Sequence, residues 1–211
     1  MKILRPLLPQ SQTANVLLDW DLKYSADSEG AWRFEQFYAQ LYREVFGKGG
    51  LGEQVVDVLR TETGAFIDFY HNFDRVLLSE ASAWFGTRTR EEIFRTAGAA
   101  ALKSPPKTWG ETHQFMMTNI FFNGRLPRFL GFDRGPYVAI GSRATIHQAQ
   151  LYRSHGRETS FLPSYRFIAD LGEDHIHTTL AGSPSDRRFS RWYASNLTDW
   201  LQGRYKTLAT V

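Results

Sequence analysis

Apolar side chains recur every three or four residues in the first half of the chain, which predicts amphipathic helices. The first stripe follows Asp27 and Ser28, either of which is a suitable N-cap residue, and it runs into the glycines at 47, 49 and 50. The apolar positions of this first stripe are Ala31, Phe34, Tyr38, Leu41, Tyr42 and Val45. A second stripe at the same spacing consists of Phe66, Phe69, Tyr70, Phe73, Val76 and Leu77.

A third helix is predicted after a local start motif. Thr89 and Glu92 have the spacing of a capping box, in which each side chain bonds the backbone of the other residue. The stripe that follows carries Ile93, Phe94, Ala97 and Ala101. Two prolines at 105 and 106 then interrupt the helical pattern. Residues 1–106 are therefore predicted to form a helical segment.

The second half of the chain changes to a strand pattern. Tyr165, Phe167, Ala169 and Leu171 alternate with Arg166, Ile168 and Asp170, which predicts a strand. A turn at residues 172–174 and a return strand from His175 to Leu180 should follow. The last stripe, Phe189, Trp192, Tyr193, Leu197, Trp200 and Leu201, predicts a closing helix. The pattern therefore predicts an α+β fold, with residues 107–211 as a β-rich segment that ends in a C-terminal helix.

Composition narrows the class of protein. The chain has 211 residues, of which 42% are hydrophobic and 15% aromatic, enough for a sizeable core. A net charge of +3 gives no argument for nucleic acid, and Arg187, Arg188 and Arg191 are interpreted as a solvated helix start. The absence of cysteine excludes disulfides and thiolate chemistry. Residues 1–6 contain no long apolar run, so we expect neither a signal peptide nor a membrane span there.

Two histidines raise the question of a metal. His175 and His177 lie two apart on the predicted return strand, so their side chains share a face about 6–7 Å apart. This spacing could hold zinc if a third ligand came from elsewhere, and a metal-dependent enzyme stays an alternative. Because the sequence places no third ligand, we favour an exposed strand face and expect no metal site.

Other catalytic patterns are incomplete. Gly141-Ser142 and Gly182-Ser183 lack the second glycine of a nucleophile elbow, so both are interpreted as turns. His113 follows Trp109-Gly110, which we interpret as an aromatic anchor, with proton transfer by His113 as the alternative.

Two charged residues share one face of the predicted strand at 165–171. Arg166 and Asp170 are about 13 Å apart along it, too far to pair with each other. If they are buried, each needs another partner. We favour structural ion pairs to neighbouring elements, and the alternative is that one of the two supports an active site.

Several motifs in a fixed order resemble the C-terminal part of the penicillin acylase (penicillin amidase) family, over about residues 14–207. They are Leu17-Leu18-Asp19-Trp20-Asp21, Trp109-Gly110, Gly141-Ser142-Arg143-Ala144-Thr145, the run from Pro163 to Leu171, and Trp200-Leu201-Gln202-Gly203-Arg204-Tyr205. The resemblance implies an N-terminal-nucleophile hydrolase with an αββα sandwich, to which this chain contributes the end of the β subunit. Residues 180–185 and 190–193 depart from the family pattern and indicate a divergent branch.

The resemblance also implies a mechanism and a division of labour. In the family, the hydroxyl of the first β-subunit residue attacks an amide carbonyl, its own α-amine serves as the base, and an oxyanion hole stabilises the intermediate. Met1 and Lys2 offer no such nucleophile. We therefore expect the nucleophile, the oxyanion-hole asparagine and the family's calcium ligands to lie upstream, and no cofactor in this chain. Asp170 matches an acidic residue that supports a histidine near the nucleophile in cephalosporin-acylase-like members, so Asp170 is our candidate catalytic-support residue.

Two hypotheses follow. The first is the C-terminal part of an amidohydrolase that cleaves side-chain amides, with acylated β-lactams or acyl-homoserine lactones as substrates. Its partner would be the remainder of the acylase polypeptide, it would be inactive alone, and a full precursor would be periplasmic or secreted. The second is a stand-alone, non-catalytic structural or binding protein derived from the same fold. It predicts a monodisperse protein that unfolds cooperatively. Neither hypothesis involves nucleic acid or a membrane.

Overall fold

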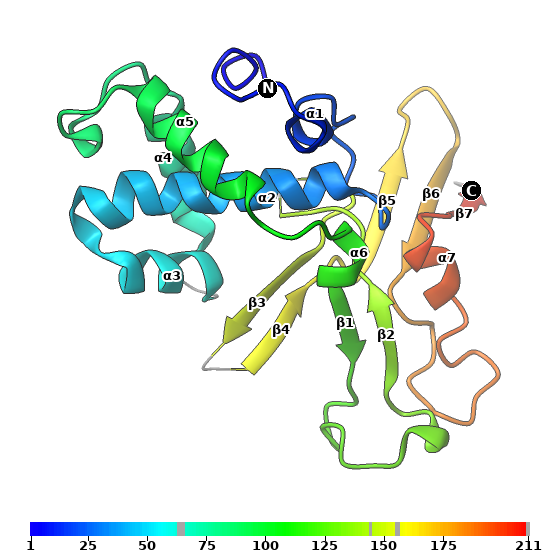
Figure 1. Cartoon of the computed structure of the whole chain (residues 1–211). Coiled ribbons are helices and arrows are strands. Elements are labelled where there is room, and N and C mark those ends of the chain that lie inside the picture. Colours follow the sequence, from blue (N-terminus) through cyan, green and yellow to red (C-terminus); the bar gives the residue numbers. More distant parts are fainter. Residues whose placement is uncertain (63–65, 144, 155–156, 210–211) are drawn as a thin grey trace. The chain divides into compact units, whose positions relative to one another are not determined.

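A computed structural model describes the chain except residues 63–65, 144, 155–156 and 210–211 (Figure 1). The side chains of residues 66–71, 153–154 and 157–160 also lie outside the description, which leaves out Phe66, Phe69 and Tyr70 of the second stripe. The chain divides into two compact units. The helical unit comprises residues 1–113 and 151–159, and the sheet unit comprises residues 114–150 and 160–211.

The three predicted helices are present in the helical unit, and their caps form as expected. Ser28 accepts a hydrogen bond from the Ala31 backbone N–H, and Thr89 and Glu92 form the complete capping box. The described helices and helical turns of this unit, in order, are α1 (Gln12–Leu18), α2 (Glu29–Tyr42), the π-helical η1 (Arg43–Leu51), α3 (Glu53–Thr61), α4 (Phe66–Leu78), the 3-10 turn η2 (Ala83–Phe85), α5 (Arg90–Leu102) and α6 (Trp109–Thr112). Within the described residues, no helix combines the length and the apolar character that crossing a bilayer requires.

The first predicted helix ends within the glycine stretch that was expected to end it. From Arg43 onward the winding widens into η1 (Arg43–Leu51) and passes Gly47. The break comes at Gly50, whose φ of +130° is outside the range of helical residues. Glycine reaches this φ without the Cβ clash that other residues meet, so the glycine-rich stretch was the correct place for the break.

The core of the helical unit is aromatic and lies along α2. Figure 1 shows α5 running beside α2, and Phe37 of α2 meets Phe94 of α5 with ring centroids 5.7 Å apart. At the other end, Tyr42 and Phe46 pack on Phe73 of α4, with centroid distances of 5.0 and 4.2 Å. Each such buried side chain contributes about 1.5–3 kcal/mol. The apolar stripes of the sequence therefore become one contiguous core.

The strands form three small sheets. The predicted hairpin is confirmed: β5 (Tyr165–Ala169) pairs antiparallel with β6 (His175–Leu180). The chain then returns to this sheet with β7 (Lys206–Ala209), which pairs antiparallel with the other side of β6. The other strands are β1 (Gln114–Met117), paired with β2 (Arg134–Val138), and β3 (Gln150–Ser154), paired with β4 (Arg157–Phe161). Together with the helices they make a mixed fold of the predicted α+β class.

The predicted closing helix is largely wrong. Only α7 (Leu197–Leu201) is helical, and residues 187–193 form turns. Phe189 and Trp192 of the expected stripe are 88% and 51% exposed. Apolar residues at helical spacing do not make a helix where polar side chains and carbonyls offer competing turn contacts, as Ser190 does for the Trp192 backbone N–H.

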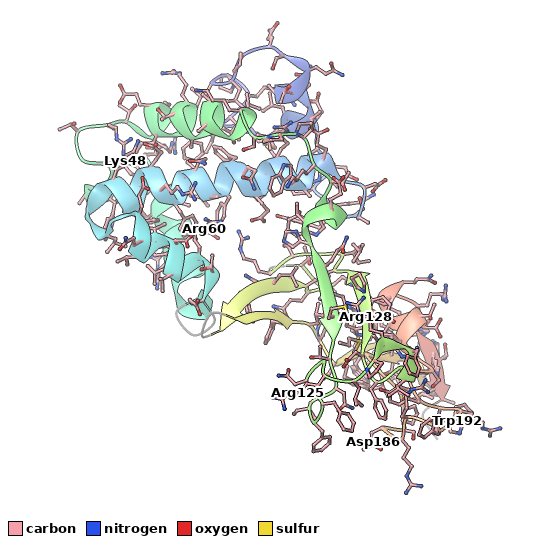
Figure 2. All side chains as sticks on the ribbon, turned by 60° about the horizontal axis from the view of Figure 1, so that its bottom comes forward. Lys48, Arg60, Arg125, Arg128, Asp186 and Trp192 are labelled. Carbon is pink, nitrogen blue, oxygen red and sulfur yellow. The ribbon has the colours of Figure 1, made fainter. Side chains whose placement is uncertain are left out.

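The basic run is likewise not a helix start. Arg188 donates from Nε to the Leu130 carbonyl, at 2.6 Å, and its guanidinium lies 5.6 Å from the ring of Tyr193. The Tyr193 hydroxyl donates to the Phe132 carbonyl. These contacts tie the turns at 187–193 to the loop that contains the 3-10 turn η3 (Arg128–Leu130). Figure 2 shows Arg128 and Trp192 at the same end of the sheet unit.

The two faces of β5 differ from the usual arrangement. The aromatic face that the alternation predicted is present, but Tyr165 and Phe167 are about half exposed, at 50% and 51%. On the opposite face Arg166 is only 7% exposed. The one buried side chain of this strand is therefore the charged one, since Ile168 on the same face is 49% exposed.

Candidate functional site

Arg166 is the centre of an enclosed polar cluster in the sheet unit. Nη1 donates to the Trp200 carbonyl at 2.6 Å, and Nη2 is 2.8 Å from Nε2 of His147. The guanidinium carbon lies 4.5 Å from the centroid of the Trp200 ring, a cation–π distance. Burial lowers the pKa of Arg166 from its ordinary value, an effect that the nearby Tyr205 opposes. Nε of Arg166 is buried and has no partner among the described residues.

His147 is held in one chemical state by this contact. Because Nε2 faces a guanidinium, which only donates, Nε2 must accept and the neutral ring must carry its proton on Nδ1. Burial, and then the charge of Arg166, lower the pKa of His147 to about 4. His147 is therefore neutral near pH 7, and its basic nitrogen is already engaged.

The loop that carries His147 is shaped by the motif at 141–145. Gly141 has a φ of +86°, and a Cβ there would lie 1.7 Å from the His147 carbonyl oxygen. The Thr145 hydroxyl is 2.8 Å from the same oxygen and accepts a hydrogen bond from the Ser142 backbone N–H. The interpretation of Gly141-Ser142 as a turn is confirmed, while Ala144 lies outside the described residues.

Trp200 brings a third segment to the cluster. Its ring is 2% exposed, Nε1 donates to the Pro163 carbonyl at 2.9 Å, and Phe115 of β1 meets the ring edge-on at 6.2 Å. Two of the sequence motifs, at 163–171 and 200–205, therefore meet at Arg166, and the motif at 141–145 shapes the loop that brings His147 to it. The expected ion pair of Arg166 with a carboxylate is wrong in the described part of the chain, where its partners are a carbonyl, an imidazole and an indole.

Asp170 does not join this cluster. It lies just outside β5, in the turn to β6, and it is exposed. Its Oδ1 accepts from the Gly172 backbone N–H at 2.9 Å, and its carbonyl accepts from the Glu173 N–H at 3.2 Å. Asp170 therefore organises a turn, with its carboxylate open to solvent. The position on a strand that we predicted for it is wrong by one residue.

A second polar cluster lies at the same turn. Glu173, His175 and His177 each place one potential ligand atom within 4.8 Å of the others. Oε2 of Glu173 is 2.9 Å from Nε2 of His175, and the rings of His175 and His177 meet edge-on at 4.9 Å. Sequence reasoning found the two histidines but missed Glu173. The sequence feature that could have identified Glu173 as a third ligand is its position two residues before His175, in the turn that leads into the strand.

His113 lies in the helical unit, in an enclosed environment. Its ring stacks on Trp109 with a centroid distance of 3.3 Å, and Nδ1 is 3.0 Å from the Thr112 hydroxyl. Trp109 is 2% exposed, and its backbone N–H donates to the Ser28 carbonyl. Burial lowers the pKa of His113 to about 4, against the opposing charge of Glu35. The interpretation of Trp109 as an anchor is confirmed.

These clusters differ in what they can do chemically. Around Arg166, a buried cation and a neutral imidazole hold three segments together, which is a positioning role. Glu173, His175 and His177 are partly exposed and offer one carboxylate and two imidazoles, the ligand types that bind transition metals.

A family model described as penicillin amidase matches residues 2–210, a span that includes both units and all of the motifs above. No curated protein matches the chain.

Proposed function

The chain belongs to the penicillin amidase family, and we propose that it is the C-terminal part of a penicillin-acylase-like amidohydrolase. The enzyme would cleave side-chain amides, with acylated β-lactams or acyl-homoserine lactones as substrates. The observation that carries the proposal is the family match over residues 2–210. The contact between two family-like motifs at Arg166 and Trp200 supports it, together with the third motif at 141–145, whose Thr145 bonds the carbonyl of His147, the other partner of Arg166.

The exposed aromatic face of the sheet supports a larger assembly. Tyr165, Phe167 and Leu208 lie on one face of the β5–β6–β7 sheet and are each about half exposed. A sheet face of this kind is normally covered, and strands at the edge of a sheet offer unpaired backbone groups. We propose that the remainder of the acylase polypeptide covers this face.

In the proposed enzyme, this chain supports the reaction without supplying the nucleophile. The hydroxyl or thiol of an N-terminal residue elsewhere in the enzyme would attack the amide carbonyl, and the C–N bond would break as the amine leaves with the nucleophile's proton. Water would then hydrolyse the acyl-enzyme and release the carboxylic acid. Asp170 is our candidate positioning residue, since its exposed carboxylate is free to approach a histidine of that part. No metal or cofactor is assigned to the reaction through this chain.

The test is to isolate the native protein. An antibody against this chain would capture it from its source, and mass spectrometry would identify the polypeptide attached to or bound with it. We expect further acylase sequence with an N-terminal Ser, Thr or Cys, and release of a primary amine from an N-acylated β-lactam or homoserine lactone. The 211-residue chain expressed alone is the control, and we expect it to be inactive.

The contrary result is also defined. A monodisperse 211-residue protein that melts cooperatively, without further acylase sequence and without amide hydrolysis, would refute the proposal. It would favour the stand-alone, non-catalytic protein instead. Size-exclusion chromatography and a thermal melt of the captured material distinguish the two outcomes.

A further inference from the structure

The β5–β6 turn gathers three metal-binding side chains on one face of the sheet. His175 and His177 are alternate residues of β6, so both project from the same face. Glu173 reaches them from the turn, and its Oε2 is 2.9 Å from Nε2 of His175. We propose that Glu173, His175 and His177 bind a divalent transition-metal ion, with zinc as the best fit.

The spacing of the ligand atoms suits one shared ion. The three atoms lie within 4.8 Å of one another. Two ligands of a tetrahedral zinc ion, each about 2.0–2.2 Å from the metal, are about 3.3 Å apart. Small side-chain rotations close the difference, since Glu173 and His175 have side chains that are 52% and 34% exposed. The same exposure gives an ion a path from solvent.

The surrounding contacts hold two of the ligands in place. His177 pairs with Thr207 of β7, and the Thr207 hydroxyl is 3.2 Å from Nδ1 of His177. A partner on one ring nitrogen fixes the tautomer and directs the other nitrogen to the metal. Glu173 is held through its backbone, because its N–H donates to the Asp170 carbonyl. Asp170 also fixes the turn through the Gly172 N–H.

The ligand set decides the class of metal. Imidazoles favour zinc and its neighbours in the transition series over calcium or magnesium, which prefer oxygen ligands alone. Two histidines and one carboxylate are three protein ligands, which leaves a position for water or another group. The site lies at the opposite end of β6 from the pair formed by Arg166 and Thr179, and it does not depend on the proposed amidase function.

The test measures zinc binding to the untagged 211-residue chain by isothermal titration calorimetry, after treatment with a chelator and desalting. We expect one zinc ion per chain. Glu173→Gln should weaken binding about tenfold or more, and His177→Ala should abolish it. Asp174→Asn is the matched control, because it makes the same charge change at the adjacent exposed residue, and it should alter affinity less than about twofold.

Cobalt provides a second measurement that does not depend on heat signals. Co²⁺ bound to the wild-type chain should give visible absorption bands that Glu173→Gln weakens and Asp174→Asn preserves. If His177→Ala fails to fold by circular dichroism, the comparison of Glu173→Gln with Asp174→Asn decides alone, because both positions are exposed. The absence of saturable zinc binding, or equal binding by these two variants, would overturn the proposal.

Discussion

Nη2 of Arg166 lies 2.8 Å from Nε2 of His147, so a buried cation on β5 donates to a neutral imidazole from a loop nineteen positions earlier. The same guanidinium bonds the Trp200 carbonyl at the end of α7. One side chain therefore joins a strand, a loop and a helix. This arrangement explains why the buried side chain of β5 is a charged one.

Replacing Arg166 tests this joining role. Arg166→Met keeps most of the apolar length but removes both hydrogen bonds, so the free energy of unfolding should fall by about 2–4 kcal/mol. Arg166→Lys should be intermediate, since an ammonium group cannot reproduce the planar fork. Urea unfolding followed by circular dichroism measures both. A Met variant as stable as the wild type would contradict the role assigned to Arg166.

The lowered pKa of His147 predicts how the stability of the fold changes with pH. Its folded-state pKa of about 4 is below the ordinary value of 6.5, so the unfolded chain binds more protons between these values. The stability that comes from neutral His147 is present above pH 6.5 and is lost as the pH falls toward 4. His113 shifts in the same direction, to about 4, and should contribute the same trend from the helical unit.

The variant that isolates His147 is His147→Gln, whose amide oxygen can still accept from Arg166 but does not titrate. Its loss of melting temperature between pH 7 and pH 4.5 should be smaller than that of the wild type. Identical pH profiles for the two proteins would show that His147 does not carry the predicted dependence.

Gly141 and Gly182 form a matched pair of glycine substitutions. Gly141→Ala places a Cβ 1.7 Å from the His147 carbonyl at a φ of +86°, so we expect a loss of several kcal/mol or failure of the sheet unit to fold. Gly182→Ala meets no atom within 4 Å and should change stability by less than about 0.5 kcal/mol. Thermal melts of both variants make the comparison, and equal effects would be inconsistent with the loop geometry.

We expect that removing the two basic partners of Glu44, which are Arg88 and Lys48, lowers the stability of the fold by unequal amounts. Burial alone would raise the pKa of Glu44, but hydrogen bonds from Lys48 and Arg88 outweigh it and the pKa is lowered. Arg88 bonds both the Glu44 carboxylate and its carbonyl, whereas Lys48, labelled in Figure 2, is 55% exposed. Arg88→Ala should therefore cost about 2–3 kcal/mol and Lys48→Ala less than about 1 kcal/mol. Denaturant unfolding decides, and equal costs would contradict this assignment.

A substitution at Asp170 can distinguish its role in forming the turn from its proposed role in supporting catalysis. Asp170→Asn retains an oxygen that accepts from the Gly172 N–H but removes the charge. In the proposed complete enzyme, we expect an unchanged melting temperature and an amide hydrolysis rate about tenfold lower or more. An unchanged rate would show that Asp170 does not support catalysis and that its role is limited to the turn.

Local patterns in the sequence predicted the parts of the fold that local forces control. The capping box at Thr89 and Glu92 and the hairpin at 165–180 formed as predicted, because their hydrogen bonds join residues close in sequence. The aromatic stripe through Phe189 and Trp192 had helical spacing, but these two side chains are more than half exposed and local turn contacts form there instead of a helix. The short strands β1 and β7 have too few residues for a periodic pattern to identify them.

The sequence by itself determined the family, the helical stripes and the hairpin that carries His175 and His177. Only the tertiary structure placed His147 and Trp200 on Arg166, because each contact spans many residues and depends on where loops and α7 pack. It also brought Glu173 to the two histidines, through a turn whose geometry depends on Asp170. Residue types and spacings specify elements, whereas partners for a buried charge or a shared ion are chosen by the path of the chain between those elements.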